Sequence, residues 1–249
     1  MKIVQFIYGL TMGGAETLVK NYALHMHDAG HEVTVLCMWN ACSPYDYELK
    51  ARGIRVVYIS EKLRIGGGHS FFAKVIRKLA FMFAAPLYIR HFFRKYKPDI
   101  LHFHLESSRI LRLAKPPITT RLFYTHHNNA KDWLTNPKRR RDVKNLKWLM
   151  CHYSVRLIAL HEQMRDILNT AFNVDNTIVL NNGVDMSRFR NAKHREVIRK
   201  ELGIPQDAFV VGHVGRFDPV KNHTFLVKVF KAVKDRVPEA FLLMIAGGK

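Results

Sequence analysis

The sequence predicts an α/β protein in which a doubly wound, Rossmann-like parallel sheet is followed by an incomplete second domain of the same kind. Two observations support this fold class. Short apolar runs alternate with segments of helical spacing, and a polar stretch interrupts the alternation after residue 186. Repeated strand–helix units fold into a parallel sheet with helices on both faces. With 48% hydrophobic and 24% charged residues, the 249-residue chain has enough apolar material for a sizeable core.

The predicted first domain, residues 1–186, opens with a strand, a glycine turn and a helix. Ile3–Tyr8 is a short apolar run, and Ala15–Ala29 has helical spacing that ends at Gly30, a residue typical of helix C-caps. A long basic and apolar helix is predicted for Phe71–Lys97, interrupted at Pro86, after a flexible loop at Gly66–Gly68. A basic connection is predicted at Pro137–Lys147 and a third helix at Glu162–Thr170. Six further strands are predicted at His31–Met38, Ile54–Ile59, Ile100–Leu105, Arg121–Thr125, Ser154–Leu160 and Thr177–Leu180.

The second domain is predicted to start at residue 207, after a linker at 187–206. Phe209–Gly215 and Phe241–Ala246 have the composition of strands, and Asn222–Val237 between them has helical spacing. Two strands and one helix leave apolar faces uncovered, so we expect this domain to be incomplete.

Cysteine content and the N-terminus indicate the compartment. The three cysteines, Cys37, Cys42 and Cys151, form no C-x-x-C pair and are too few for a disulfide framework. The N-terminus lacks the pattern of an export signal, and no run of about 18 uncharged apolar residues is present. We therefore expect a cytoplasmic protein.

The net charge of +20 favours a polyanionic partner. A nucleic-acid partner is disfavoured because no recognition motif accompanies the charge. The segment from Lys74 to Lys97 combines basic and aromatic residues without an acidic one, which predicts peripheral contact with an anionic membrane at the inner face of the cell membrane. Arg139–Arg141 adds to this surface if it faces the same way. The alternative is that the aromatic residues fill the core and the basic ones are merely solvated.

The first glycine turn is a candidate ligand-binding loop. It lacks the G-x-G-x-x-G spacing, and no acidic residue ends the second strand, which disfavours a nicotinamide dehydrogenase. Gly13 and Gly14 still allow backbone N–H groups to approach a ligand at a helix N-terminus, although both could serve only to relieve steric crowding in the turn. Glu16 would oppose a phosphate directly above the helix, so a sugar or a glancing phosphate contact is expected.

Two pairs of histidines are candidates for chemistry. His126 and His127 follow a predicted strand, where an imidazole can bind a sugar hydroxyl or transfer a proton, although a structural role is the alternative. His102 and His104 lie two residues apart on a strand and so share a face. No Cys, Asp or Glu is spaced to complete a metal site with these pairs, so we expect no metal.

The loop from Gly215 to Asn222 is a candidate anion site. Arg216 and Lys221 both lie between a predicted strand and the next helix, where they can converge on a phosphate at the helix N-terminus. The alternative is that both are ordinary solvated surface residues.

Taken in order, these segments resemble glycosyltransferase family 4, whose members are retaining sugar transferases of the GT-B fold. The resemblance covers the whole chain. It is specific because the segments, taken together and in this order, are far more specific than any one of them. It implies two facing Rossmann-like domains, of which the first receives the acceptor and the second the nucleotide-sugar donor. The matching segments are Met12–Glu16, Pro98–His102, Asn182–Asp185 with Phe189, and Gly215–Arg216 with Lys221.

The resemblance also implies roles for the candidate residues. Gly13 and Gly14 would form a loop near donor phosphate and acceptor, and Arg216 and Lys221 would neutralise the donor diphosphate. His127 would lie beside the transferred sugar, with His126 as the alternative. The implied reaction transfers a sugar from a nucleotide-diphosphate sugar to a glycan or lipid-linked acceptor with retained configuration, without a cofactor or an obligatory metal.

Two departures from the family pattern bear on activity. His161–Glu162 stands where the family commonly has Ser–Glu, which could change a local contact. The family's later acidic motif, which holds donor sugar and ribose, is absent from these 249 residues. We therefore expect poor donor binding by this chain alone. The alternative function is a non-catalytic half-enzyme that docks on a separate donor-binding chain.

Overall fold

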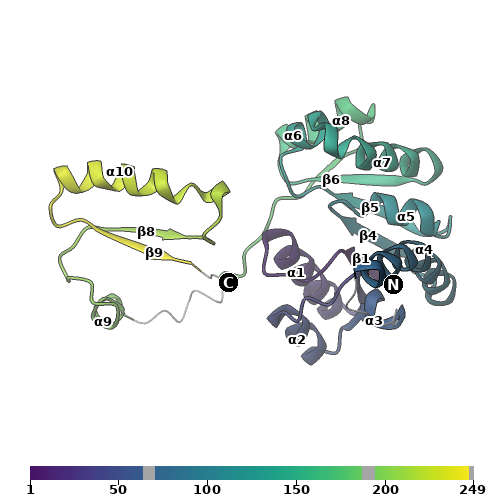
Figure 1. Cartoon of the computed structure of the whole chain (residues 1–249), viewed down its shortest axis with the longest axis horizontal. Helices are drawn as coiled ribbons and strands as arrows, with labels where there is room; N and C mark the ends of the chain where they lie inside the picture. The colour runs from purple at the N-terminus through teal and green to yellow at the C-terminus, as the bar shows by residue number, and fades with distance from the viewer. Residues whose placement is uncertain (64–70, 187–193, 247–249) are drawn as a thin grey trace. The chain divides into compact units, whose positions relative to one another are not determined.

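The computed structural model of the chain describes residues 1–63, 71–186 and 194–246, with the backbone alone at 71–78. The predicted loop at Gly66–Gly68 and the residue Phe189 lie outside the described residues. The chain divides into two compact units, Met1–Gly183 and Val184–Lys249, called unit 1 and unit 2 below (Figure 1).

Unit 1 is built on a seven-stranded sheet in which every neighbouring pair is parallel. The strand order is β3-β2-β1-β4-β5-β6-β7, so the winding direction reverses between β1 and β4. Such a reversal leaves a crevice at the carboxyl ends of the two strands, where ligands of these folds bind. The strands are β1 (Lys2–Ile7), β2 (Glu32–Cys37), β3 (Arg55–Tyr58), β4 (Ile100–His104), β5 (Arg121–Thr125), β6 (Val155–Ala159) and β7 (Ile178–Val179).

Helices cover both faces of this sheet, which confirms the predicted doubly wound fold. Ile7 of β1 packs with residues of α1 (Gly14–Asp28) and α2 (Pro44–Ala51) in one buried cluster. Val4 and Phe6 pack into a second cluster on the other face. That second cluster draws on α4 (Phe71–Tyr96), α5 (Ser108–Ala114), α7 (Arg140–His152) and α8 (Glu162–Phe172). Because β1 is buried on both faces, its residues from Ile3 to Ile7 are apolar apart from Gln5, rather than alternately apolar and polar.

Three expectations about the helices of unit 1 were wrong. Helix α4 continues through Pro86, because Ala85, Ile89 and Phe93 anchor it in the core on both sides of the one amide that proline lacks. The basic segment Pro137–Lys147 is a 3₁₀ turn, η1 (Pro137–Arg139), followed by the start of α7, not a connection. Four short helices were not predicted: α2, α3 (Ile59–Leu63), α5 and α6 (Ala130–Thr135).

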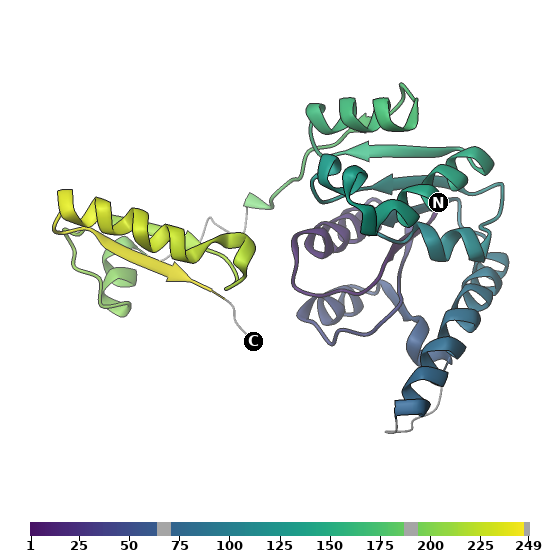
Figure 2. The same ribbon diagram turned by 45° about the horizontal axis from the view of Figure 1, so that its top comes forward.

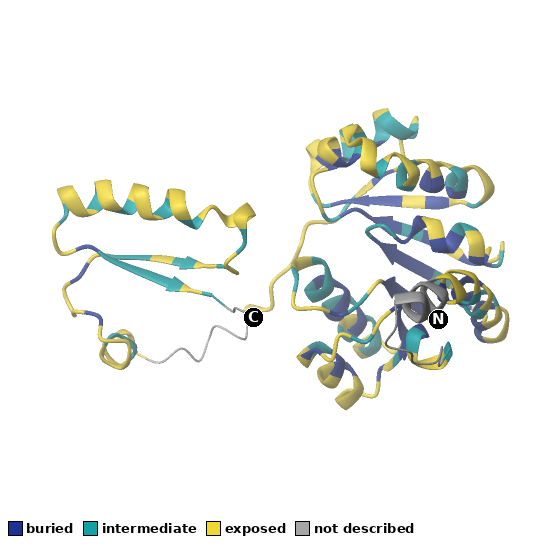
Figure 3. Cartoon of the chain, viewed as in Figure 1, coloured by how far each residue is buried: buried dark blue, intermediate teal, exposed yellow. Residues whose placement is uncertain are grey.

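The described residues of unit 2 form a strand–helix–strand with one further helix. Its two strands, β8 (Val210–Val214) and β9 (Phe241–Ile245), pair in parallel. Helix α10 (His223–Arg236) connects them, preceded by the 3₁₀ turn η3 (Pro219–Lys221). Helix α9 (Arg195–Glu201) lies within 187–206, the segment predicted as a linker. Figure 3 shows that this unit is mostly exposed, whereas the strands of unit 1 are mostly buried.

Candidate functional site

The turn after β1 lies at the point where the sheet reverses its winding. Gly13 is the N-cap of α1 and supplies no side-chain cap. The Glu16 carboxylate folds back over this end of the helix, where it accepts a hydrogen bond from Thr11 Oγ1 at 2.8 Å and approaches the position that a Gly13 side chain would take. Gly14 has open space at its Cβ position. The carboxylate disfavours a full phosphate on this helix end and leaves room for a sugar hydroxyl beside Gly14.

Five buried or half-buried side chains meet between β1, β4 and the end of β5. His104 is fully buried, and its Nε2 lies 2.8 Å from Gln5 Oε1. Its Nδ1 lies 3.0 Å from Nε2 of His127, the first half-exposed residue after β5. His102, on the same face of β4, has its Nε2 2.8 Å from Thr125 Oγ1. Parallel pairing of β1 with β4 and of β4 with β5 brings these residues together.

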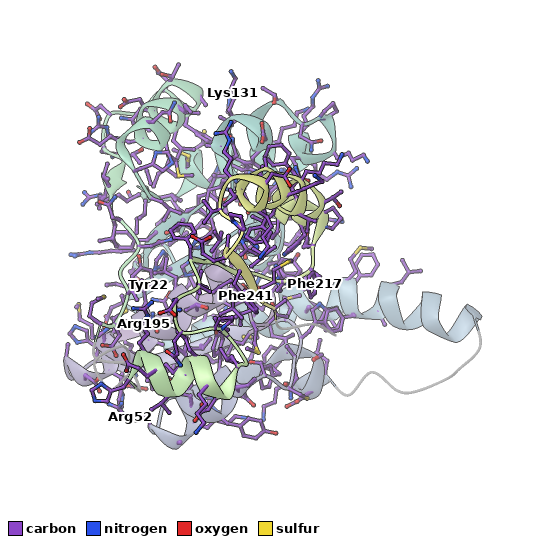
Figure 4. The ribbon with its side chains drawn as sticks, turned by 90° about the vertical axis from the view of Figure 1, so that its left-hand side faces the viewer. Tyr22, Arg52, Lys131, Arg195, Phe217 and Phe241 are labelled. Carbon is purple, nitrogen blue, oxygen red and sulfur yellow. The ribbon has the colours of Figure 1, made fainter. Side chains whose placement is uncertain are left out.

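Helix α1 closes this cluster from above. Tyr22 of α1, labelled in Figure 4, lies over His102 with ring centroids 5.6 Å apart. The rings of His102 and His104 are 4.0 Å apart. The two histidines therefore share a face, as their spacing on the strand predicts, and both are shielded from water.

Burial holds these imidazoles in the neutral form. It lowers the pKa of His102 to about 3 and that of His127 to about 4. The pKa of His104 is lowered well below its usual value, by burial first and then by the neighbouring His102 and His127. At neutral pH each ring therefore carries a single proton and can both donate and accept a hydrogen bond.

His126 and His127 have different surroundings. His126 is only 2% exposed, stacks on Trp133 with ring centroids 4.3 Å apart, and has its Nδ1 3.2 Å from the Tyr124 hydroxyl. Burial lowers its pKa to about 4. These contacts give His126 a packing role, whereas His127 keeps a partly open surface.

A cavity of about 390 Å³ opens beside His127, between the loop after β5 and the start of α8. Lys131 of α6 (labelled in Figure 4) and Gln163 of α8 contribute polar side chains to its wall. His161, the departure from the family's Ser–Glu pair, is the N-cap of α8, and its Nδ1 accepts a hydrogen bond from the Met164 amide at 3.2 Å. The capping contact that a serine would make is thus preserved. The remaining lining residues are Asn128, Asn129, Ala130, Leu160 and Ile167.

A smaller cavity of about 170 Å³ lies on the other side of the same loop. Glu106 and Arg139 form an ion pair at its rim. Asp142, in the first turn of α7, accepts a hydrogen bond from Trp133 Nε1 at 3.1 Å. Burial raises the pKa of Asp142 to about 6. The sequence does not single out this carboxylate, because it lies within the basic segment Pro137–Lys147, which predicts a connection.

In unit 2, Arg216 and Lys221 both lie exposed in the loop between β8 and α10. Lys221 passes close over Gly215, since its Cγ is 3.7 Å from the position that a Gly215 Cβ would occupy. Asn222 begins α10 by accepting a hydrogen bond from the Phe225 amide through its side chain. Both cations thus lie in the segment between β8 and the first residue of α10, His223.

The histidine cluster does not form a metal site with other groups. In the part of the chain that the structure describes, no three His, Cys, Asp or Glu side chains are arranged to hold a metal ion. Sequence reasoning overlooked Gln5 as a site residue. The available signal was a single amide side chain inside the otherwise apolar run Ile3–Tyr8.

Comparison with protein families gives two matches that together cover most of the chain. A model described as Glycosyltransferase Family 4 matches residues 12–188, and one described as Glycosyl transferases group 1 matches residues 194–249. EpsF of Bacillus subtilis strain 168, which is described as a glycosyltransferase, is 27% identical over 99% of this chain. An Escherichia coli UDP-Gal:α-D-GlcNAc-diphosphoundecaprenol α-1,3-galactosyltransferase is 29% identical over 63% of it. The chain spans 62% and 42% of the lengths of these two relatives.

Solved structures show the same fold. TarM matches the whole chain with a TM-score of 0.63 at 12% identity, and 72% of TarM is covered. WaaG, a glycosyltransferase involved in lipopolysaccharide biosynthesis, matches 98% of the chain with a TM-score of 0.59 at 10% identity, and 70% of WaaG is covered. These matches show the GT-B fold predicted from the sequence. Since the first family model covers well over half of the residues, the chain belongs to glycosyltransferase family 4.

Proposed function

We propose that this chain takes part in transferring a sugar from a nucleotide-diphosphate sugar to a glycan or lipid-linked acceptor, with retained configuration and no obligatory metal or cofactor. The observation that carries the proposal is His127, a neutral and partly open imidazole at the carboxyl edge of the sheet, beside a cavity with amide, imidazole and ammonium side chains. Such groups suit the hydroxyls of a sugar.

Arg216 and Lys221 are the proposed contacts to the donor diphosphate. A forked guanidinium and an ammonium at a helix N-terminus stabilise the negative charge that develops on a departing diphosphate. Gly13 and Gly14 are proposed to let acceptor or donor approach the backbone of α1. Membership of the family supports these roles, because the motifs that carry them lie within the two matched segments.

The test is turnover in the longest natural polypeptide that contains this sequence, measured with a panel of radiolabelled uridine and guanosine diphosphate sugars. We expect His127→Ala to lower kcat by about 10²–10⁴ with unchanged circular dichroism. His126→Phe, which keeps the stacking on Trp133, is the matched control and should retain activity. Full turnover in His127→Ala together with a collapse in His126→Ala would show that His126 is the histidine beside the sugar.

Residues 1–249 by themselves should bind donor weakly, because Arg216 and Lys221, the proposed phosphate contacts, are both exposed side chains on a loop. Calorimetry with the same sugars should give no micromolar binding. Micromolar affinity that disappears in Arg216→Ala and Lys221→Ala would contradict the view that donor binding needs more protein.

A second candidate, a binding subunit that docks on a separate donor-binding chain, is favoured by the exposed apolar side chains of unit 2. Phe217, Val220 and Phe225 are all exposed there. A partner that covers them would make assembly detectable by analytical ultracentrifugation. A sugar transferase activity in the longest natural polypeptide acting as a monomer would rule this candidate out.

We also propose contact with an anionic membrane through α4. Its exposed side chains Leu79, Phe83 and Leu87 follow one another at intervals of four residues, and His91 and Lys95 continue the same ridge. Helix α4 leads from the end of β3 to the start of β4. Its N-terminal half, which carries Leu79, Phe83 and Leu87, therefore lies at the carboxyl edge of the sheet, as His127 does. Figure 2 shows this half extending away from the body of unit 1.

A basic cavity lies at the other, C-terminal end of α4, beside the amino ends of β1 and β3. It measures about 340 Å³ and is lined by Lys2, Arg55, His91 and Lys95 together with aromatic rings of α4. Among the described residues that line it, none is acidic. Cations near aromatic and apolar side chains suit lipid headgroup phosphates. Three basic residues of the predicted segment Lys74–Lys97, namely Lys74, Arg77 and Lys78, have side chains outside the described part. No helix among the described residues has the length and apolar character to cross a bilayer.

Vesicle sedimentation tests the membrane proposal. The chain should bind anionic but not neutral vesicles, and high salt should release it. Phe83→Asp with Leu87→Asp should weaken binding, whereas Ile118→Asp, at a residue 76% exposed elsewhere on unit 1, should not. Equal recovery in the supernatant with both kinds of vesicle at low salt would contradict the proposal.

A further inference from the structure

We propose that Gln5 and His104 are positioning residues that hold His127 as its Nε2-protonated tautomer, so that His127 offers Nδ1 to the ligand as a hydrogen-bond acceptor. This inference rests on the proposed function, in which His127 lies beside the sugar. It assigns a direction to the hydrogen bond at that site, and with it the chemistry of the ligand group: a hydroxyl that donates.

The first step is the orientation of the Gln5 amide. Gln5 is fully buried in β1, and its Nε2 lies 3.3 Å from Met26 Sδ of α1. A thioether sulfur has lone pairs and no hydrogen, so it can only accept. The amide nitrogen therefore faces Met26, and the amide oxygen faces His104 at 2.8 Å.

The second step is the tautomer of His104. Because Gln5 Oε1 can only accept, Nε2 of His104 must carry the hydrogen and donate it. His104 has no exposed surface, and burial keeps it neutral, so its single proton is committed to this bond. Its Nδ1 is consequently an acceptor.

The third step fixes His127. Nε2 of His127, 3.0 Å from His104 Nδ1, must donate to it. A neutral His127 then has no proton on Nδ1. That atom has no hydrogen-bond partner within the described ranges 1–63, 71–186 and 194–246, and His127 lines the 390 Å³ cavity. His127 thus donates to His104, and His104 donates to Gln5. The lone pair on His127 Nδ1 is left for the ligand.

The consequence is selectivity for the group that meets His127. A sugar hydroxyl can donate to Nδ1, whereas a phosphate or carboxylate oxygen without a proton cannot. Replacing the ligand hydroxyl by hydrogen or fluorine removes the donor and should lower affinity or turnover by about tenfold or more.

The decisive experiment reads the tautomer directly, by long-range ¹H–¹⁵N NMR correlation of the imidazoles in ¹⁵N-labelled residues 1–249 at neutral pH. We expect His127 Nε2 to show a protonated shift and Nδ1 an unprotonated one. A protonated Nδ1, or an imidazolium, in the unaltered chain would overturn the proposal. No variant is needed for this measurement, so loss of folding cannot confuse it.

Variants of His104 then separate positioning from packing. In His104→Asn, the amide oxygen replaces Nδ1 as acceptor, and His127 should keep its tautomer. His104→Leu removes the acceptor, so His127 should populate both tautomers and kcat should fall about tenfold in the longest natural polypeptide. His102→Asn, which alters a neighbouring buried histidine bonded to Thr125, is the control and should leave the His127 shifts unchanged. Unchanged His127 shifts in His104→Leu would also overturn the proposal.

These experiments distinguish a failure of the proposed function from a failure of the positioning proposal. If His127 shows the expected tautomer but His127→Ala turns over normally, the positioning stands and the role of His127 in transfer fails. If His127→Ala is inactive but Nδ1 is protonated, the transfer role stands and the positioning fails.

Discussion

Units 1 and 2 contain the same sequence pattern, an apolar strand, a helix and an apolar strand, with different burial. In unit 1, β1 and β4 carry fully buried side chains such as Phe6 and Phe103. In unit 2, neither β8 nor β9 has a buried residue. The described buried apolar residues of unit 2 are Ile204, Ala208 and Ala240. The pattern therefore predicts the elements, whereas burial depends on how many layers pack against them.

The same difference separates the candidate residues of unit 1 from those of unit 2. His127 is held by a buried hydrogen-bonded chain through His104 to Gln5, so its geometry is set before a ligand arrives. Arg216 and Lys221 are exposed side chains on a loop. We infer that unit 1 is preorganised, and that the basic pair of unit 2 gains its geometry from additional protein or from the donor.

The sharpest test of this comparison is a phenylalanine in each unit. Phe103→Ala should lower the free energy of unfolding of unit 1 by about 3–5 kcal/mol, because it leaves a cavity in the sheet core. Phe225→Ala, at a residue 60% exposed in α10, should leave unit 1 within about 0.5 kcal/mol of its original stability. All three tryptophans, Trp39, Trp133 and Trp148, lie in unit 1, so fluorescence during urea unfolding reports on that unit alone. Equal effects of the two substitutions would contradict the comparison.

Acid should destabilise unit 1 through its buried histidines. The folded pKa of His126 is about 4, so below the ordinary value of 6.5 the unfolded chain binds a proton that the folded one excludes. The folded state keeps its full stability with respect to His126 above pH 6.5, and it loses stability as the pH falls from 6.5 toward 4. Each buried histidine should lower the free energy of unfolding by about 1–3 kcal/mol at acid pH, and His126→Phe should remove the contribution of His126. Urea unfolding at a series of pH values measures it, and stability independent of pH across this range would contradict the prediction.

Asp142 should show the opposite sign. Burial raises its folded pKa from 3.8 to about 6, so its ionisation weakens unit 1 as pH rises through this interval. Asp142→Asn keeps an acceptor for Trp133 Nε1 and removes the charge, so unit 1 should gain about 1–2 kcal/mol at neutral pH, after allowance for partial solvent access. The gain should vanish below pH ~4. A gain that persists there would point to packing as its cause.

The smallest effects concern glycines. Gly14→Ala should stabilise unit 1 by about 0.5–1 kcal/mol, because the Cβ meets open space in the first turn of α1. Gly203→Ala in unit 2 should destabilise that unit by about 1 kcal/mol, because Gly203 has a φ of +65°. Hydrogen exchange resolves the two units separately. If Gly14→Ala also weakens sugar binding, the backbone of this turn contacts the ligand.

Much of the fold was accessible from local patterns. The apolar run of β5, Arg121–Thr125, was predicted at the residues where the strand lies. Helix α1 was predicted within one residue at each end, since its apolar spacing and Gly30 are both local signals. Pro86 misled the prediction because an interior proline breaks an isolated helix, and only core contacts on both sides of it make the loss of one hydrogen bond tolerable.

The sequence by itself therefore determined the strands, the glycine turn, and the position of His127 just after β5. Only the tertiary structure decided that His126 is buried against Trp133 while His127 stays partly open. It alone revealed the bond between Gln5 and His104, which are 99 residues apart and meet because β4 crosses over to lie beside β1. Local patterns report each residue's preference for an element, whereas the tautomer of His127 depends on hydrogen-bond partners that only the order of strands in the sheet can supply.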